Sequence, residues 1–204
     1  TKRELASQAI HIEQEKIGEA VGSQDQIAAA FGGLNRITFR KKNDFEVESI
    51  IISSSRLQNL QDNLLLCFTG YARTASEIAE LQIQNTEKKI DELRGMQNLC
   101  EEAFDCLVNY KSSLDNFGSL LNEQWNLKRG MSKLVSNRKI DEVYEAGIDA
   151  GALGGKLLGA GGGGFMLFYA PKDRHLLIQK ALNEKMFVPF RFEETGSKII
   201  YFSH

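Results

Sequence analysis

The chain has 204 residues, of which 42% are hydrophobic and 25% are charged, a balance typical of globular proteins with a buried core. Its formal net charge of −2 provides no basic field of the kind that nucleic acid or an anionic membrane surface attracts. No apolar run reaches the ~18 residues of a membrane span. We therefore expect neither a nucleic-acid partner nor a membrane segment.

The first 40 residues predict two helices followed by a strand. Apolar side chains recur at helical spacing over residues 2–17, and Gly18 fits the stop of that helix. A polar turn at 21–25 leads into a short run of small apolar residues at 27–31, which predicts a second, tightly packed helix. The stretch 34–39 alternates like a strand.

The middle of the chain changes from strands to helices. Residues 45–53 and 63–69 are rich in β-favouring side chains, and we expect the Ser/Gln/Asn segment between them to be a loop. The pattern of residues 74–129 predicts three helices, and we expect Gly95 and Gly130 to mark where helices end. The apolar positions do not keep a heptad, so a helical layer on a sheet is favoured over a coiled coil.

The last third of the chain alternates helices and strands around a glycine-rich stretch at 151–164. This order predicts an α+β fold, with helices on one face of a mostly antiparallel sheet. We place a domain boundary at residues 44 and 45. In chain order the expected elements are helix 138–150, strand 165–169, helix 172–185 and a closing antiparallel pair of strands at 187–192 and 198–202.

Glu13 and Asp25 are the first candidates for chemistry. Glu13 lies on the first predicted helix and Asp25 on the turn after it, so one fold-back can bring both carboxylates to one cleft. Phosphoryl transfer uses such a pair, one holding Mg²⁺ and the other orienting the attacking hydroxyl. The alternative is a surface pair of Glu13 with Lys16, together with an Asp25 that caps the next helix.

The segment Gly159–Gly164 reads Gly-Ala-Gly-Gly-Gly-Gly. Ordering so many glycines costs entropy, and backbone amides that approach an anion are one reason to accept that cost. The segment matches G-x-G-x-x-G but leads into a strand rather than a helix, which excludes a Rossmann site. Walker A and protein-kinase signatures are absent from the sequence. The alternative is a bend where backbone packs on backbone.

Two motifs together resemble the GHMP kinases, the superfamily of galactokinase and of homoserine, mevalonate and phosphomevalonate kinases. Gly22-Ser-Gln-Asp-Gln26 is similar to the family's G-x-x-D-Q segment, and Glu13 precedes Asp25 at the spacing of galactokinases. Lys156–Phe165 looks like the family's third glycine motif. The resemblance implies the end of a ribosomal-protein-S5-like N-terminal lobe at 1–44, followed by a ferredoxin-like C-terminal domain at 45–204.

Within this superfamily, three segments most resemble bacterial D-glycero-D-manno-heptose phosphate kinases: His11–Glu15, Gly22–Asn35 and Phe68–Ser76. The resemblance implies a cytoplasmic enzyme, a possible homodimer, that uses ATP and Mg²⁺ to phosphorylate a sugar phosphate, D-glycero-D-manno-heptose 7-phosphate. The alternatives are a galactose, fucose or mevalonate type of acceptor, or a non-catalytic relative that binds a ligand.

The resemblance also implies roles for individual residues. Asp25 corresponds to the catalytic carboxylate and Glu13 to the Mg²⁺ ligand. The loop that meets the γ-phosphate and the acceptor corresponds to Gly159, Gly161, Gly162, Gly163 and Gly164. Substrate contacts are assigned to Thr69, Gly70, Arg73 and Gly33. An ion pair of Arg73 with Glu77, one turn later, is the alternative for Arg73.

One family feature does not occur in the sequence. The central nucleotide loop P-x-x-x-G-L-G-S-S is absent from the 204 residues. In the family that loop precedes the helix that corresponds to residues 2–17. The resemblance therefore implies that this chain alone binds ATP poorly and has no kinase activity.

Overall fold

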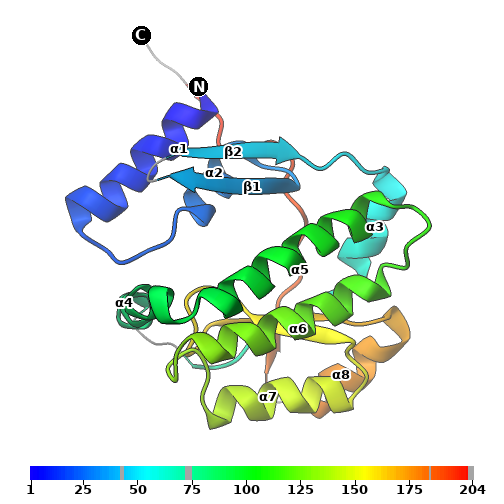
Figure 1. Ribbon diagram of the computed structural model, residues 1–204. Helices are drawn as coiled ribbons and strands as arrows, with labels where there is room; N and C mark the ends of the chain where they lie inside the picture. The colour runs from blue at the N-terminus through cyan, green and yellow to red at the C-terminus, as the bar shows by residue number, and fades with distance from the viewer. Residues whose placement is uncertain (42–43, 72–74, 184, 202–204) are drawn as a thin grey trace. The chain divides into compact units, whose positions relative to one another are not determined.

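The structure is a computed structural model, which describes residues 1–41, 44–71, 75–183 and 185–201 (Figure 1). Its chain forms two compact units, one made of Thr1–Ile51 with Arg191–His204 and the other of Ile52–Phe190. These units are described separately below. The domain boundary expected at residues 44 and 45 stays a prediction.

The first unit packs two helical segments against a two-stranded antiparallel sheet. Thr1 and Glu4 begin the first helix with a reciprocal capping box. Its core is small and is formed by the buried side chains of Ala6, Ile10, Ile27, Ala30 and Phe45. The elements are α1 (Lys2–His11), the π-helical turn η1 (Ile12–Ile17), α2 (Gln24–Phe31), β1 (Asn35–Lys41) and β2 (Asp44–Ser49).

The C-terminal tail runs along the end of α2 instead of forming the expected strand. The amide of Ser197 donates to the carbonyl of Ala29 at 2.8 Å. A Cβ on Gly32 would lie 2.0 Å from the amide nitrogen of Gly196, so the two backbones approach closely only because both residues are glycines. Residues 198–201 have no strand structure, so the predicted closing pair was wrong.

The second unit is built on an antiparallel four-stranded sheet with strand order β4-β5-β3-β6. Alternate residues of β3, β4 and β5 point to one face, where Leu65, Cys67, Leu157, Met166 and Phe168 join the main hydrophobic core. The predicted strand at 165–169 was confirmed. The strands are β3 (Leu64–Phe68), β4 (Gly154–Leu157), β5 (Phe165–Tyr169) and β6 (Met186–Phe187).

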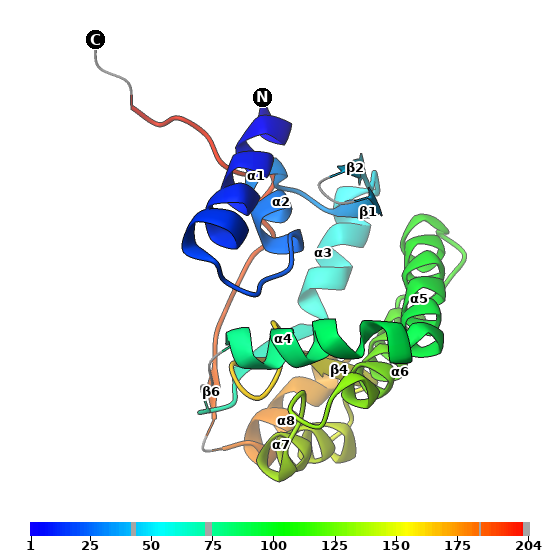
Figure 2. The same cartoon turned by 60° about the vertical axis from the view of Figure 1, so that its left-hand side comes forward.

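Helices pack against this sheet, and Figure 2 shows α7 and α8 together at the lower end of the unit. The predicted helical region at 74–129 contains three α-helices, as expected. The helices are α4 (Ala75–Asn85), α5 (Ile90–Val108), α6 (Asp115–Met131), α7 (Arg138–Asp149) and α8 (His175–Ala181), with short 3₁₀ turns η2 (Thr86–Lys88) and η3 (Lys172–Arg174).

Gly95 and Gly130 do not separate helices, so this prediction was wrong. Gly95 lies inside α5 and Gly130 inside α6. A Cβ on Gly95 would lie 2.9 Å from Cδ1 of Leu127 in α6. The glycine therefore allows close packing of α5 against α6, which run side by side in Figure 1.

The expected Ser/Gln/Asn loop before β3 is also wrong, because Ser54–Asp62 form the helix α3. Ser53 caps this helix by accepting a hydrogen bond from the amide of Arg56. Within α3 only Leu60 is buried. A helix with so few apolar positions gives almost no periodic signal in the sequence.

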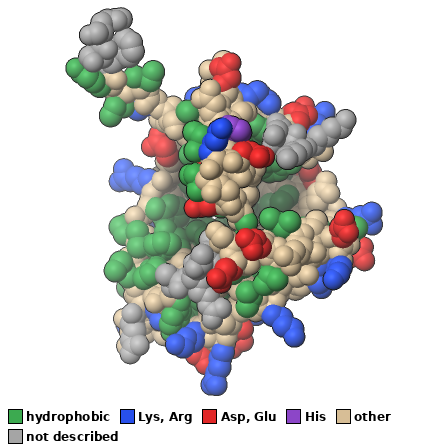
Figure 3. Space-filling view, turned by 90° about the vertical axis from the view of Figure 1, so that its left-hand side faces the viewer, with side chains coloured by type: hydrophobic (Ala, Val, Ile, Leu, Met, Phe, Trp, Pro, Cys, Tyr) green, Lys and Arg blue, Asp and Glu red, His purple; other side chains and the backbone are tan. Residues whose placement is uncertain are grey.

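The predicted α+β fold class was confirmed. Basic and acidic side chains are interspersed on the face drawn in Figure 3. Among the described residues, no helix combines the length and the apolar character that crossing a membrane requires.

Candidate functional site

Glu13 lies in a π-helical turn, a rare conformation that is frequent at functional sites. The backbone carbonyl of Glu13 accepts hydrogen bonds from the amides of Gly18 and Glu19, which are five and six residues later. Gly18 adopts a left-handed conformation, with φ 78°, and ends the turn as expected.

Gln26 holds the Glu13 carboxylate. Its Nε2 donates to Oε2 of Glu13 at 2.5 Å, and the Gln26 side chain is buried. Among the described residues, Lys16 forms no ion pair with Glu13. The surface pair of Glu13 with Lys16 is therefore not observed.

Asp25 directly precedes Gln26 in the first turn of α2 and is exposed. Ser23, not Asp25, occupies the N-cap position, so the alternative role of Asp25 as a helix cap is not observed. Gln14 fixes the connecting turn, because its Nε2 donates to the carbonyl of Val21 at 2.9 Å and to Oγ of Ser23 at 3.2 Å. The turn and the Glu13–Gln26 bond bring the Glu13 carboxylate beside the residue that follows Asp25.

This arrangement fits a magnesium ion bound together with phosphate. Mg²⁺ keeps several waters and is held by one or two carboxylates plus substrate phosphates. Among the described residues, no group of three or more His, Cys, Asp or Glu side chains gathers to hold a metal ion by itself. A single oriented carboxylate at Glu13 suits a magnesium site that the protein forms together with the phosphates of a substrate.

Gly33 lies in the same unit, after α2. Its amide donates to the backbone carbonyl of Glu193 at 2.7 Å. The Gly33 amide is therefore engaged within the protein, and its assignment to substrate binding stays a prediction.

The glycine loop connects β4 to β5 in the second unit. Its residues 159, 161, 162 and 164 all have positive φ, which explains the density of glycine. A Cβ on Gly161 would lie 2.7 Å from the carbonyl oxygen of Val135. Close packing of backbone on backbone, the alternative reading of the run, is therefore present at Gly161.

Some loop amides are used inside the protein and others are not. Gly162 N–H donates to the carbonyl of Val135 at 2.9 Å, and Gly164 N–H donates to the carbonyl of Tyr71 at 2.7 Å. Within the described residues, the remaining amides, those of Gly159, Ala160, Gly161 and Gly163, donate to no group. These are the amides that the loop has available for an anion.

Thr69 and Gly70 lie at the end of β3, beside this loop. The Thr69 hydroxyl donates to the carbonyl of Gly164 at 2.8 Å, and the Thr69 amide donates to the same oxygen at 2.9 Å. Thr69 is fully buried, so it holds the loop rather than presenting a hydroxyl to solvent. Arg73, also predicted to bind substrate, lies outside the described residues.

The predicted site residues thus fall into two groups. Glu13, Asp25 and Gly33 belong to the first unit, and the glycine loop with Thr69 and Gly70 belongs to the second. The convergence of the carboxylates with the glycine loop stays a prediction.

Comparison with known proteins finds a family match within the second unit. Residues 103–187 match the family model described as GHMP kinases C terminal. Over 199 residues, or 96% of this chain, the sequence is 31% identical to a D-glycero-alpha-D-manno-heptose 7-phosphate kinase of Campylobacter jejuni. Residues 103–187, which lie within the second unit, match a GHMP kinase C-terminal domain. It spans 58% of the length of that Campylobacter relative.

Solved structures agree with this assignment. A Campylobacter jejuni protein described as a sugar kinase is 27% identical, with a TM-score of 0.62 over 96% of this chain and 56% of its own. A D-glycero-D-manno-heptose 1-phosphate kinase from Bacteroides thetaiotaomicron has a TM-score of 0.68 and 24% identity, over 96% of this chain and 55% of its own. The second of these supports the fold alone.

Two lysines beside the glycine loop of the GHMP kinase domain were not singled out from the sequence. Lys128 Nζ donates to the carbonyl of Gly159 at 2.5 Å. Lys156 lies on β4, and burial lowers the pKa of its ammonium group below the usual 10.5. Its place in the motif Lys156–Phe165 was the only available signal.

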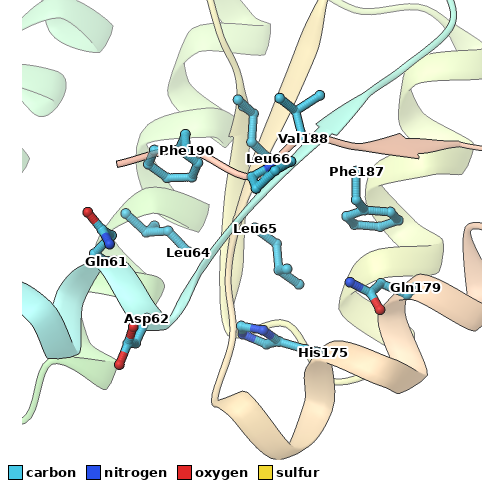
Figure 4. Close-up of a pocket in the computed structure, with 11 residues that line it drawn as sticks. Gln61, Asp62, Leu64, Leu65, Leu66, His175, Gln179, Phe187, Val188 and Phe190 are labelled. Atoms are coloured by element: carbon cyan, nitrogen blue, oxygen red, sulfur yellow. The ribbon is translucent and has the colours of Figure 1, made fainter. Parts of the chain in front are cut away.

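The second unit also has a hollow of about 350 Å³, lined in part by Leu64, Leu65 and Leu66 of β3. Figure 4 shows that Asp62, at the end of α3, and His175, on α8, line it with apolar side chains of β3 and of the segment after β6. Lys172 Nζ lies 2.5 Å from Asp62 Oδ2, and this hydrogen bond is the main cause that lowers the pKa of Asp62. His175 Nε2 lies 3.0 Å from the carbonyl oxygen of Ala170. The Asp62 carboxylate and the His175 ring, which line the hollow, are thus each held by a neighbour within the second unit.

Proposed function

We propose that the protein is an ATP-dependent small-molecule kinase that phosphorylates a hydroxyl of a sugar phosphate, D-glycero-D-manno-heptose 7-phosphate. The observation that carries this proposal is the hydrogen bond from Gln26 to Glu13, which holds a carboxylate beside the turn that bears Asp25. The GHMP kinase C-terminal domain supports the reaction class. The name of the Campylobacter relative supports the acceptor.

Asp25 orients the attacking hydroxyl in this proposal. Transition states of phosphoryl transfer are loose, so positioning and charge neutralisation contribute more than early proton removal. Asp25 is exposed in the first turn of α2, and its carboxylate is therefore accessible to a bound acceptor. It accepts the hydroxyl proton as the oxygen attacks.

Glu13 holds the metal in this proposal. Mg²⁺ bound with ATP supplies charge neutralisation of the phosphates. Glu13 Oε2 already accepts the hydrogen bond from Gln26, which leaves Oε1 as the oxygen for the ion. The Gln26 amide orients the carboxylate in the way that outer partners orient metal ligands.

The glycine loop stabilises the transferred group. The unengaged amides of Gly161 and Gly163 are suited to the developing negative charge on the γ-phosphoryl oxygens. The engaged amides of Gly162 and Gly164 fix the shape of the loop, because they are held by Val135 and Tyr71. The loop is thus anchored at alternate residues and has amides available between the anchors.

A panel of acceptors tests this proposal. The full-length protein is assayed for ATP-dependent phosphorylation of heptose 7-phosphate, heptose, galactose, fucose and mevalonate. We expect the highest kcat/KM with heptose 7-phosphate. Turnover confined to mevalonate or to an unphosphorylated sugar would overturn the assignment of heptose 7-phosphate as the acceptor. No turnover with any compound of the panel would overturn the kinase function. The 204-residue chain alone is expected to show no turnover.

A further inference from the structure

Tyr71 is flanked by two lysines that come from distant parts of the chain. Lys139 Nζ and Lys185 Nζ each lie 4.9 Å from the centre of the Tyr71 ring. Lys139 is in the first turn of α7, and Lys185 lies between α8 and β6. Tyr71 follows β3. The fold therefore gathers two ammonium groups around one aromatic ring.

Within the part of the chain that the structure describes, no carboxylate pairs with the two ammonium groups of this cluster, those of Lys139 and Lys185. The nearest acidic residues along α7, Asp141 and Glu142, are paired with Arg129 and Arg138. The Tyr71 ring attracts both ammonium groups through its π face but carries no net charge. The two like charges are favoured together when an anion lies near both.

The cluster is connected to the glycine loop. The Tyr71 carbonyl accepts the hydrogen bond of the Gly164 amide at 2.7 Å. Asn137, the N-cap of α7, donates from Nδ2 to the carbonyl of Gly162 at 3.4 Å. The positive end of the α7 dipole therefore lies beside the loop, and Lys139 adds charge at the same end.

Gly70 leaves space on the side of Lys185. A Cβ at position 70 would lie 3.7 Å from Lys185 Nζ, and beyond residues 69–71 no other described atom lies within 4 Å of it. Lys139 and Lys185 are both at the surface rather than fully buried. A ligand can therefore reach both ammonium groups from solvent.

We propose that Lys139 and Lys185, arranged around Tyr71, bind a phosphate group. The proposal deepens the proposed function and rests on it for the source of that phosphate, which is either the phosphate already on the acceptor sugar or a phosphate of ATP. Lysine ammonium groups bind phosphate as point charges, and their hydrogen bonds to it are charge-assisted. An acceptor phosphate held here distinguishes a sugar phosphate from the free sugar.

Binding of inorganic phosphate tests the cluster without requiring turnover. The dissociation constant is measured by calorimetry for the full-length protein and for Lys139→Gln, Lys185→Gln and Lys180→Gln. Lys180 is an exposed lysine of α8 and serves as the matched control. We expect each cluster variant to weaken binding about tenfold, which is the loss of one charge-assisted hydrogen bond, and the control to bind like the parent. Equal affinity in all four proteins would overturn the proposal.

Kinetics then identify the source of the phosphate. If KM for heptose 7-phosphate rises in Lys139→Gln and Lys185→Gln while KM for ATP is unchanged, the cluster binds the acceptor. If KM for ATP alone rises, it binds the nucleotide. Unchanged values of both KM would overturn a role of the cluster in the reaction. A parent protein without turnover would refute the proposed function. The phosphate titration would still show whether the lysine cluster binds phosphate.

Discussion

The Gln26 side chain donates a hydrogen bond from Nε2 to the Glu13 carboxylate, and this bond joins a π-helical turn to the first turn of α2. It is a bond between a buried amide and a partly exposed acid. The amide therefore orients the carboxylate while leaving it accessible to a ligand.

Gln26→Leu tests this orienting role. The substitution keeps the side-chain size but removes the donor to Glu13. Loss of an outer partner of a metal ligand typically weakens metal affinity about 10- to 100-fold. We expect the Mg²⁺ concentration for half-maximal activity to rise by such a factor in the full-length protein, with Gln24→Leu on the exposed side of the same turn as the control. An unchanged Mg²⁺ dependence would mean that Gln26 is structural only.

Gly161→Ala tests the close packing of the glycine loop. A Cβ there would lie 2.7 Å from the Val135 carbonyl oxygen, at φ +124°. Overlap with backbone adds to a conformational strain of about 1–3 kcal/mol. Gly159→Ala is the control, because its φ is +71° but no atom lies within 4 Å of the added Cβ. Urea unfolding should show the larger loss of stability for Gly161→Ala, and equal losses would contradict the close packing.

Arg56→Lys tests a cap that the guanidinium forms at the end of α5. Arg56 donates to the carbonyls of Leu107 at 2.7 Å and Cys106 at 2.6 Å, and also to those of Asn109 and Ser112. A lysine retains the charge but not the planar fork. We expect a loss of about 2–3 kcal/mol in the free energy of unfolding.

The matched control for this prediction is Arg94→Lys. Arg94 lies on α5, the helix that Arg56 caps, with its side chain 74% exposed, and is 3.9 Å from Asp91. Such surface pairs contribute about 0–1 kcal/mol. If denaturation midpoints of the two variants coincide, the guanidinium of Arg56 does not act as a cap.

Lys156→Met tests the cost of placing an ammonium group in a half-buried position. Burial lowers the pKa of Lys156 in the folded protein, whereas the unfolded chain has the usual value of 10.5. Between these two values the unfolded state binds more protons, so stability rises with pH. At pH 7 the buried charge destabilises the fold, and methionine removes the charge while keeping an unbranched apolar stem. We expect a higher urea midpoint for Lys156→Met at pH 7.

The pH dependence distinguishes this effect from better packing. The stability advantage of Lys156→Met should shrink as the pH rises from the lowered pKa of folded Lys156 toward 10.5, because the folded protein loses the Lys156 proton in this range while the unfolded chain still binds it. A difference that stays constant from pH 7 upward would show that charge burial is not its cause.

The sequence predicted the elements whose side chains repeat regularly. The strand Phe165–Tyr169 and the long helices α5 and α6 were expected, because their apolar residues recur at strand or helix spacing. The glycine run was recognised as a loop before a strand. Its internal anchoring by Val135 and Tyr71 was not predictable, because those contacts join residues far apart in the chain.

The errors have physical causes as well. α3 was expected to be a loop because it has one buried side chain and many polar ones. Gly95 was expected to end a helix, but the space that it leaves is filled by Leu127 of the neighbouring helix. The tail at 198–201 has strand-forming residues but lacks a paired neighbour, because Ser197 is bonded to the end of α2. At Gly95 and in the tail, tertiary contacts overrode the local preference.

The central claim is that the carboxylate of Asp25 orients the acceptor hydroxyl for phosphoryl transfer. The most direct test is kcat of the full-length Asp25→Asn variant with heptose 7-phosphate and saturating MgATP. We expect kcat to fall by about 10²- to 10⁴-fold, the usual contribution of a positioned acid or base, while KM for ATP changes little. A kcat equal to that of the parent would contradict the account.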